Sequence, residues 1–381
     1  MRRRPGANRR ALALAIVFAG APLACGPTEP DPSSASPRPT VAAQPSPTAV
    51  IRPSPGPVDA ATIEVHVLDA NHRPRSGLRS AGSEMTWSTG SEIWRYAPGD
   101  VQPELVHSMD GPFEVIDVAR SARGYAFTER NHRNGAWRLS WLADGASEPI
   151  VVDHGVAAGA LAPTIAIDDR RLAWAGFDEP DAGALSFLRV VDLEAPTAVR
   201  ELLSLPIADG LLWYPVLDGG TLWFAIIHAD FEGTGKGDEF HLETIALGDA
   251  GARPRRFAGV ANDFEPAVSP TNVAWKTVEP GLAALTWGEV HILDRDTGET
   301  RRVPLPNLNH PSLGRRFLAF DEISRHRLLL FDLARGEVLE VPGPRDGSDT
   351  TFSGASLAGD LWTFIIGTDD GPRIGWARLP E

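Results

Sequence analysis

The sequence predicts an all-β fold: a single β-propeller of seven four-stranded blades over residues 61–381, with six blades as the alternative. Three observations predict it. From residue 62 on, apolar residues alternate with period two, and glycine, proline and aspartate interrupt the runs every 6–12 residues, which is typical of many short strands. One aromatic motif recurs along the chain. The two ends of this region also complement each other as incomplete parts of one sheet.

The repeated motif is an apolar residue, a small residue or tryptophan, and then a large aromatic. Its seven copies end 40, 47, 50, 51, 45 and 44 residues apart, at Trp87, Phe127, Trp174, Phe224, Trp275, Phe320 and Phe364. Units of this length hold four strands and are typical of propeller blades. A lone four-stranded sheet cannot cover both of its apolar faces, so each aromatic is expected to fill the space between neighbouring blades.

The ends of the repeat region predict how the ring closes. The last copy has three strands before the chain ends at Glu381, so its outer strand is missing. Residues Thr62–Leu68 form an unpaired strand before the first copy. We expect this strand to pair with Arg373–Leu379, because pairing removes an open sheet edge. The alternative of six blades arises because the first copy is the weakest, with Ser80 where five of the other six copies have an aliphatic residue.

The proline-led strands resemble those of TolB-like and WD-repeat-like bacterial propellers. The segment from Glu265-Pro266 through Trp275 is the nearest match, and Pro215 through Phe224 is the next. The resemblance covers roughly residues 76–381 and concerns architecture. It implies a binding scaffold that faces the periplasm or the outside of the cell.

The first sixty residues predict export and a membrane anchor. Residues 1–10 carry five arginines and residues 11–24 are apolar, which is the pattern of a signal peptide. Cys25, the one cysteine in the chain, follows directly in a segment that resembles a bacterial lipobox, with Pro22 in place of the usual small or aliphatic residue. We expect a lipid on Cys25. Residues 26–60 hold ten prolines and eight Ser or Thr, so residues 25–60 are expected to be a disordered tether.

The charge of the chain limits its partners. The net charge of −14 becomes −19 once the five arginines of the signal peptide are removed. Nucleic acid is therefore an unfavourable partner, because phosphate neutralisation supplies most of the affinity for it. The same charge argues against lying flat on an anionic membrane. Contact with the membrane is expected through the lipid alone.

The candidate ligand site lies on the loop face, defined as the face of the ring that carries the hairpin after each second strand and the connections between blades. Acidic residues and histidines gather in these segments. The candidates are Asp178, Glu179, His228, Asp230, Asp263, Glu265, His310, Asp321 and Glu322, with Glu129 and His132 in an equivalent segment. Two interpretations stay open: ordinary acidic loops of an acidic protein, or a site for a cation such as calcium or for a cationic ligand.

Two functional hypotheses follow. The sequence contains no Gly-x-Ser-x-Gly, no His-Glu-x-x-His and no cysteine pair, so no catalytic residue and no resident cofactor is assigned, calcium being the possible exception. The first hypothesis is a non-enzymatic binding or scaffolding lipoprotein of the cell envelope, with a protein, peptide or glycan partner. The second is a glycan hydrolase or lyase that uses loop-face carboxylates and a histidine, with His228, Asp263, Glu265 and His310 as candidates.

Overall fold

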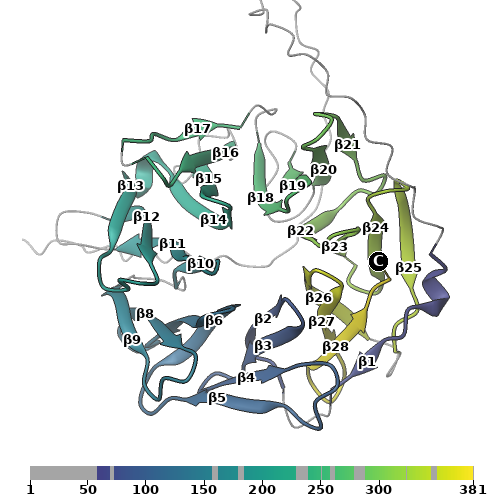
Figure 1. Ribbon diagram of the computed structural model, residues 1–381, viewed down its shortest axis with the longest axis horizontal. Helices are drawn as coiled ribbons and strands as arrows, with labels where there is room; N and C mark the ends of the chain where they lie inside the picture. The colour runs from purple at the N-terminus through teal and green to yellow at the C-terminus, as the bar shows by residue number, and fades with distance from the viewer. Residues whose placement is uncertain are drawn as a thin grey trace, which may run out of the picture. The chain divides into compact units, whose positions relative to one another are not determined.

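The computed structural model describes residues 58–68, 73–156, 162–178, 184–228, 239–249, 251–257, 262–278, 288–322, 324–344 and 350–380. Within these ranges the strands form seven four-stranded sheets arranged as a ring (Figure 1). The predicted seven-bladed β-propeller is confirmed, and the alternative of six blades is wrong. None of the helices in the described ranges has the length and apolar character that crossing a membrane requires.

Each blade is numbered here from its innermost strand outward. Blade 1 consists of β2 (Ser76–Ala81), β3 (Glu84–Ser88), β4 (Glu92–Tyr96) and β5 (Glu104–Ser108). Blade 2 consists of β6 (Glu114–Ser121), β7 (Gly124–Arg130), β8 (Ala136–Ala143) and β9 (Ile150–Val156), and blade 3 of β10 (Thr164–Ile167), β11 (Arg171–Asp178), β12 (Leu185–Asp192) and β13 (Arg200–Pro206). Blade 4 consists of β14 (Leu211–Asp218), β15 (Thr221–His228), β16 (Glu239–Ala246) and β17 (Arg255–Arg256).

Blades 5 and 6 follow the same order, and blade 7 takes its outer strand from the start of the chain. Blade 5 consists of β18 (Asp263–Val268), β19 (Asn272–Thr277), β20 (Glu289–Asp294) and β21 (Thr300–Arg302). Blade 6 consists of β22 (Leu308–Leu313), β23 (Phe317–Glu322), β24 (Leu328–Asp332) and β25 (Glu337–Val341). Blade 7 consists of β26 (Thr351–Ala358), β27 (Leu361–Gly367), β28 (Arg373–Arg378) and β1 (His66–Val67). Two short 3₁₀ helices, η1 (Ala60–Thr62) and η2 (Ile207–Asp209), lie outside the blades.

The repeated aromatic occupies one equivalent position in all seven blades. It is the fourth residue of the second strand each time, and its exposed fraction is between 0 and 5%. Each ring packs into an apolar cluster shared with the preceding blade: Trp174 lies with Trp137 of blade 2, and Phe224 lies with Leu188 of blade 3. The expectation that these aromatics fill the spaces between blades is confirmed. Burial of large aromatics at every boundary holds the ring together.

The ring closes as predicted, with a shorter closing strand. His66 pairs with Trp376 and Val67 with Gly375, and the two rings of the first pair stack at 4.2 Å. The strand does not begin at Thr62, because Asp59 caps η1 by accepting a hydrogen bond from the backbone N–H of Ala61 at 3.0 Å.

The propeller belongs to a compact unit that runs from Gly56 to Glu381. The predicted signal peptide, Cys25 and nearly all of the predicted tether lie outside the described residues.

Candidate functional site

Three of the nine predicted loop-face residues come together near the axis of the ring. Glu265 is the third residue of β18 and His310 the third residue of β22, so both lie on innermost strands of adjacent blades. Glu265 Oε2 accepts a hydrogen bond from the backbone N–H of His310 at 2.9 Å, and Glu265 Oε1 lies 3.8 Å from His310 Nε2. Asp321, near the end of β23, lies 3.3 Å from His310 Nδ1. We call these three residues the axial cluster.

The carboxylate of Asp321 extends the axial cluster to a third blade. Its two oxygens accept hydrogen bonds from the backbone N–H groups of Gly354 and Ala355 on β26, at 2.9 and 3.0 Å. On the other side, Glu265 accepts the hydroxyl hydrogen bond of Tyr214 on β14. The hydrogen bonds therefore run from blade 4 to blade 7 around the axis, and the two carboxylates bind backbone or side-chain donors of the blades beside them.

The backbone of these innermost strands is strained where the cluster forms. Tyr214, Glu265 and His310 have φ values of 52°, 50° and 49°, in the left-handed region that non-glycine residues rarely adopt. Each precedes a proline and lies where the pairing of its strand shifts register. In blades 1 and 7 glycines, Gly77 and Gly354, hold the same kind of position at no steric cost. Strain of this kind persists where the surroundings fix it, and it concentrates at functional sites.

The side chain of His310 is far more exposed to solvent than the carboxylates that bind it. The Glu265 side chain is 4% exposed and the His310 side chain is 56% exposed. Burial alone would lower the pKa of His310, but the hydrogen bond with Asp321 and the negative charges of Glu265 and Asp321 outweigh it, so its pKa is raised. The pKa of Tyr214 is raised well above its ordinary value by burial and by the charge of Glu265. The imidazole is thus the solvent-facing member of an otherwise buried group.

A buried lysine lies beside the axial cluster. Lys276, on β19, donates a hydrogen bond to the side-chain oxygen of Asn309, which precedes His310. Its ammonium lies 5.0 Å from the centre of the Phe264 ring. Burial lowers the pKa of Lys276, and the charge of Glu265 opposes that change. Sequence reasoning missed both Lys276 and Tyr214, although Tyr214 precedes the first of three prolines that recur in consecutive repeats.

The other predicted residues serve their own blades or blade boundaries. Asp178 pairs with Arg189 at 3.5 Å, and burial together with the charge of Asp153 raises the pKa of Asp178. Glu322 pairs with Arg327 at 3.0 Å. These two carboxylates are occupied by cross-strand or hairpin ion pairs. Glu179 and Asp230 lie outside the described residues.

The structure does not bring the four candidate residues of the hydrolase or lyase hypothesis into one group. Glu265 and His310 are in contact, whereas Asp263 accepts a hydrogen bond from Thr277 of its own blade at 2.7 Å. His228 lies with His241 of its own blade, with ring centres 5.2 Å apart. This arrangement does not favour the hydrolase or lyase. Within the described ranges, no group of three or more His, Cys, Asp or Glu side chains is placed to hold a metal ion.

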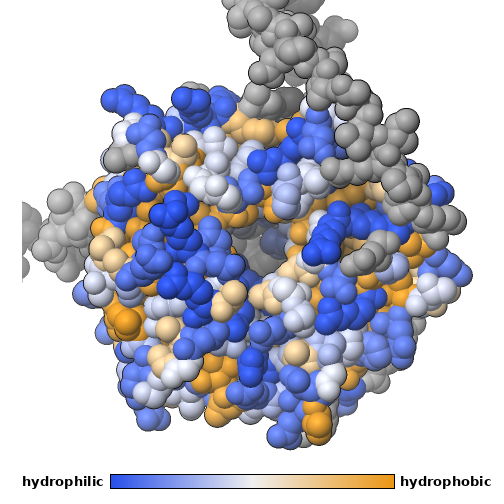
Figure 2. Space-filling model, in the orientation of Figure 1, coloured by the Kyte–Doolittle hydropathy of each residue, from blue (hydrophilic) through white to orange (hydrophobic). Residues whose placement is uncertain are grey.

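Two cavities lie away from the axis, along the boundary of blades 1 and 2. The larger has a volume of about 490 Å³ and is lined by residues of β5, β7, β8 and β9. Of the residues around it, sequence reasoning singled out Glu129. The smaller, of about 290 Å³, is lined by Arg95, Glu104, Arg120 and Asp144 among others. On the face drawn in Figure 2 the centre of the ring is hollowed, and hydrophilic side chains cover much of the surrounding surface.

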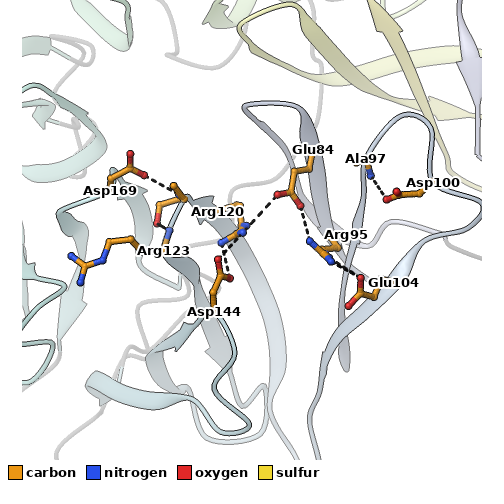
Figure 3. Close-up of polar contacts among 11 residues, drawn as sticks. Glu84, Arg95, Ala97, Asp100, Glu104, Arg120, Arg123, Asp144 and Asp169 are labelled. Carbon is orange, nitrogen blue, oxygen red and sulfur yellow. Dashed lines mark hydrogen bonds and ion pairs between the residues drawn. The ribbon is translucent and has the colours of Figure 1, made fainter.

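The charged residues around the smaller cavity form ion pairs with one another (Figure 3). Glu84 lies between the guanidinium groups of Arg95 and Arg120, at 3.3 and 3.7 Å. Arg120 binds both oxygens of Asp144, at 2.9 and 3.0 Å, and stacks over the Tyr125 ring at 4.4 Å. Every charged group that the structure describes here already has a partner of opposite charge, so these ion pairs tie blade 1 to blade 2 and leave no free cation or carboxylate for a ligand.

Comparison with known proteins identifies the fold, but it identifies neither a family nor an activity. No protein-family model and no curated protein matches the sequence. Among solved structures, an oligogalacturonate lyase in complex with manganese aligns over 84% of this chain and 96% of its own, with a TM-score of 0.55 and 14% identity. The β-propeller domain of the Trilobed protease from Pyrococcus furiosus aligns over 81% and 96%, with a TM-score of 0.58 and 10% identity.

The same architecture recurs within larger enzymes. Pyrococcus horikoshii acylaminoacyl peptidase aligns over 84% of this chain and 52% of its own, with a TM-score of 0.57 and 12% identity. The chain is a seven-bladed β-propeller. At these identities the neighbours, which include a lyase and peptidases, share its architecture, and fold alone does not carry their activities over to it.

Proposed function

We propose that this protein is an exported, lipid-anchored binding module of the cell envelope, and that it binds a peptide segment of an envelope protein at the axial cluster. Cys25 would carry the lipid, and residues 25–60 would tether the propeller to the membrane. The proposed contact is His310, on the loop face near the axis.

The single observation that carries the proposal is the way the half-exposed imidazole of His310 is held. Its backbone N–H is bound by the buried Glu265 at 2.9 Å, its Nδ1 lies 3.3 Å from Asp321, and its own φ is 49°. The bond to Glu265 and the left-handed conformation define the backbone from which the ring projects, and Asp321 orients the solvent-facing ring itself. Fixing a side chain before it meets a ligand reduces the entropy lost on binding, which is how preorganised sites gain affinity.

The chemistry of His310 suggests the kind of group it binds. The Nε2 atom is 3.8 Å from the nearest Glu265 oxygen, which exceeds hydrogen-bond length. In the protonated ring both nitrogens carry hydrogen, so Nε2–H remains able to donate to an incoming acceptor. A carbonyl or carboxylate oxygen of a peptide is such an acceptor.

A peptide array tests the proposal. The mature, full-length chain is applied at about pH 6 to random fifteen-residue peptides, beside the variants His310→Gln and His154→Gln. His154 is exposed on the outer strand β9 and serves as the matched control. We expect the wild type and His154→Gln to select the same peptides, and His310→Gln to lose them. An unchanged peptide profile in His310→Gln would contradict the proposal.

A further inference from the structure

The larger cavity between blades 1 and 2 is separate from the axial cluster and has the features of a ligand site. Its wall combines the outer strand of blade 1 with three strands of blade 2. It is lined by His107, Ser108, Met109, Asp110, Glu129, Arg138, Ser140, Ser147, Glu148, Pro149 and Val151. A volume of about 490 Å³ falls within the range of small-molecule sites in proteins, which is roughly 300–1,000 Å³.

The floor of this cavity is a buried, hydrogen-bonded ion pair. Glu129 accepts hydrogen bonds from Arg138 Nε at 2.7 Å and from Arg138 Nη2, and a third from the hydroxyl of Ser140 at 2.9 Å. The guanidinium of Arg138 also stacks over the Phe113 ring, 4.4 Å from its centre. Glu129 is 1% exposed and Arg138 is 32% exposed, so the arginine is the member of the pair that reaches the cavity.

The geometry leaves one edge of Arg138 directed away from Glu129. A carboxylate that binds Nε and Nη2 occupies one side of the planar guanidinium, and the Nη1 hydrogens point elsewhere. Because the ring of Phe113 and the bonds to Glu129 fix the plane, Nη1 is a positioned donor.

The remaining lining residues add acceptors and small hydroxyls. Asp110 and Glu148 are exposed carboxylates at the rim, and Ser108 and Ser147 are exposed hydroxyls. An anion entering the cavity would meet these two carboxylates with one arginine already paired to Glu129. A cation would find only the two solvent-exposed rim carboxylates, whose attraction is weakened by water and salt, because Glu129 is already paired with Arg138. A ligand without net charge, whose groups both donate and accept hydrogen bonds, meets no repulsion and can bind at both the rim and the floor.

We infer that this cavity is a second binding site, and that it takes a neutral saccharide of one or two sugar rings. Sugar hydroxyls would accept a hydrogen bond from Arg138 Nη1 and donate to the rim carboxylates. Met109, Pro149 and Val151 supply apolar surface for the C–H faces of a ring. The inference does not depend on peptide binding at His310, because the lining residues of the two sites are different.

Isothermal titration calorimetry on the full-length mature chain tests the inference. The neutral probes are maltose, cellobiose and N,N′-diacetylchitobiose. The charged probes are digalacturonate, which is anionic, and the glucosamine dimer, which is cationic. We expect at least one neutral disaccharide to bind more tightly than both charged probes.

Two variants place the binding in the cavity. Ser147→Phe puts a large ring at the exposed rim without touching the buried ion pair, and should weaken binding of the neutral probe about tenfold or more. Ser83→Phe, at an exposed hairpin position of blade 1, is the matched control and should bind as the wild type does. Arg138→Lys keeps a cation beside Glu129 and removes the Nη1 donor, so it should also weaken binding.

Three outcomes would overturn the inference. One is the absence of binding of every neutral probe to the wild type. Another is tighter binding of digalacturonate or of the glucosamine dimer than of any neutral probe. The third is unchanged affinity in Ser147→Phe, with the variant shown to be folded by its circular dichroism spectrum.

Discussion

The carboxylate of Glu265 in blade 5 accepts a hydrogen bond from the backbone N–H of His310 in blade 6, at 2.9 Å. A buried side chain of one blade thereby fixes the strained innermost strand of the next. Asp321 does the same one blade further on, through the N–H groups of Gly354 and Ala355. Near the axis, then, polar side chains complement the apolar contacts that hold neighbouring blades together.

Replacing Glu265 with alanine should lower the free energy of unfolding. The backbone N–H of His310 and the hydroxyl of Tyr214 would both lose their acceptor. A buried donor left without a partner costs about 1–3 kcal/mol, and we expect a loss in this range from urea unfolding. Glu265→Gln keeps an acceptor oxygen and should lose less. Glu299→Ala, on the exposed end of a turn, should unfold as the wild type does; an equal loss there would refute the assignment.

The charge of His310 should make stability depend on pH in a defined direction. Its pKa is raised in the folded protein above the ordinary value of 6.5. A raised folded pKa gives stabilisation that is fully present below about pH 6.5 and is lost as the pH rises through the folded pKa. The difference in unfolding free energy between the wild type and His310→Gln should therefore be larger at about pH 6 than at about pH 9.

The same ring can be followed directly. In an NMR titration, the ring C–H signal that is absent from the His310→Gln spectrum should have its midpoint above 6.5. A midpoint at or below that value would show that the carboxylates of Glu265 and Asp321 do not stabilise the cation.

The fold was predictable because its signal is local and repeated. The aromatic positions follow from alternation within single strands, so the seven copies already indicated seven blades. The axial cluster was predictable in part, because Glu265 and His310 share a place in the repeat, each directly before a proline. That same position holds Tyr214, which charge-based reasoning passed over since an uncharged residue does not stand out among acidic loops.

The rest of the site depends on facts that no local pattern contains. Asp178, for example, pairs with Arg189 instead of facing the axis. That pairing depends on the register between β11 and β12 and on the approach of β9 from the preceding blade. Lys276 is buried at the boundary of blades 5 and 6, where it lies over Phe264 of its own blade and donates to Asn309 of the next. The cavity at Arg138 results from the spacing between β5 and the outer strands of blade 2, which is a property of the assembled ring.

Shortening Ile63 to alanine should weaken closure of the ring. Ile63 is 5% exposed and packs with Phe317, Trp362 and Phe364, so it anchors the segment that leads into β1. Truncating a buried isoleucine to alanine lowers the free energy of unfolding by about 2–5 kcal/mol. Val67→Ala, at a half-exposed position of β1 itself, should cost much less, as judged by urea unfolding of both variants. Equal losses would mean that strand pairing alone closes the ring.

Truncating one of the repeated aromatics should be among the most damaging changes. Phe224 has no exposed surface and packs against Leu188 and Leu222 between blades 3 and 4. Phe224→Ala should lower the unfolding free energy by about 3–5 kcal/mol, and Phe224→Leu by less, because leucine refills most of the cavity. Phe257, a partly buried aromatic outside the repeated position, gives the comparison. If Phe257→Ala proves as costly as Phe224→Ala, the repeated position has no special weight.

Replacing Cys25 with serine should release the protein from the membrane. The proposed anchor is a lipid on the sulfur of Cys25, and the chain after it is acidic, so the protein should have no other strong attraction to an anionic bilayer. In fractionated cells we expect the wild type with the membranes and Cys25→Ser in the soluble fraction. Mass spectrometry of the wild-type N-terminal peptide should show a mass increase that matches acyl chains, and Pro22→Ala should retain or increase it. An unmodified cysteine, or a Cys25→Ser variant that stays with the membrane, would require a different means of attachment.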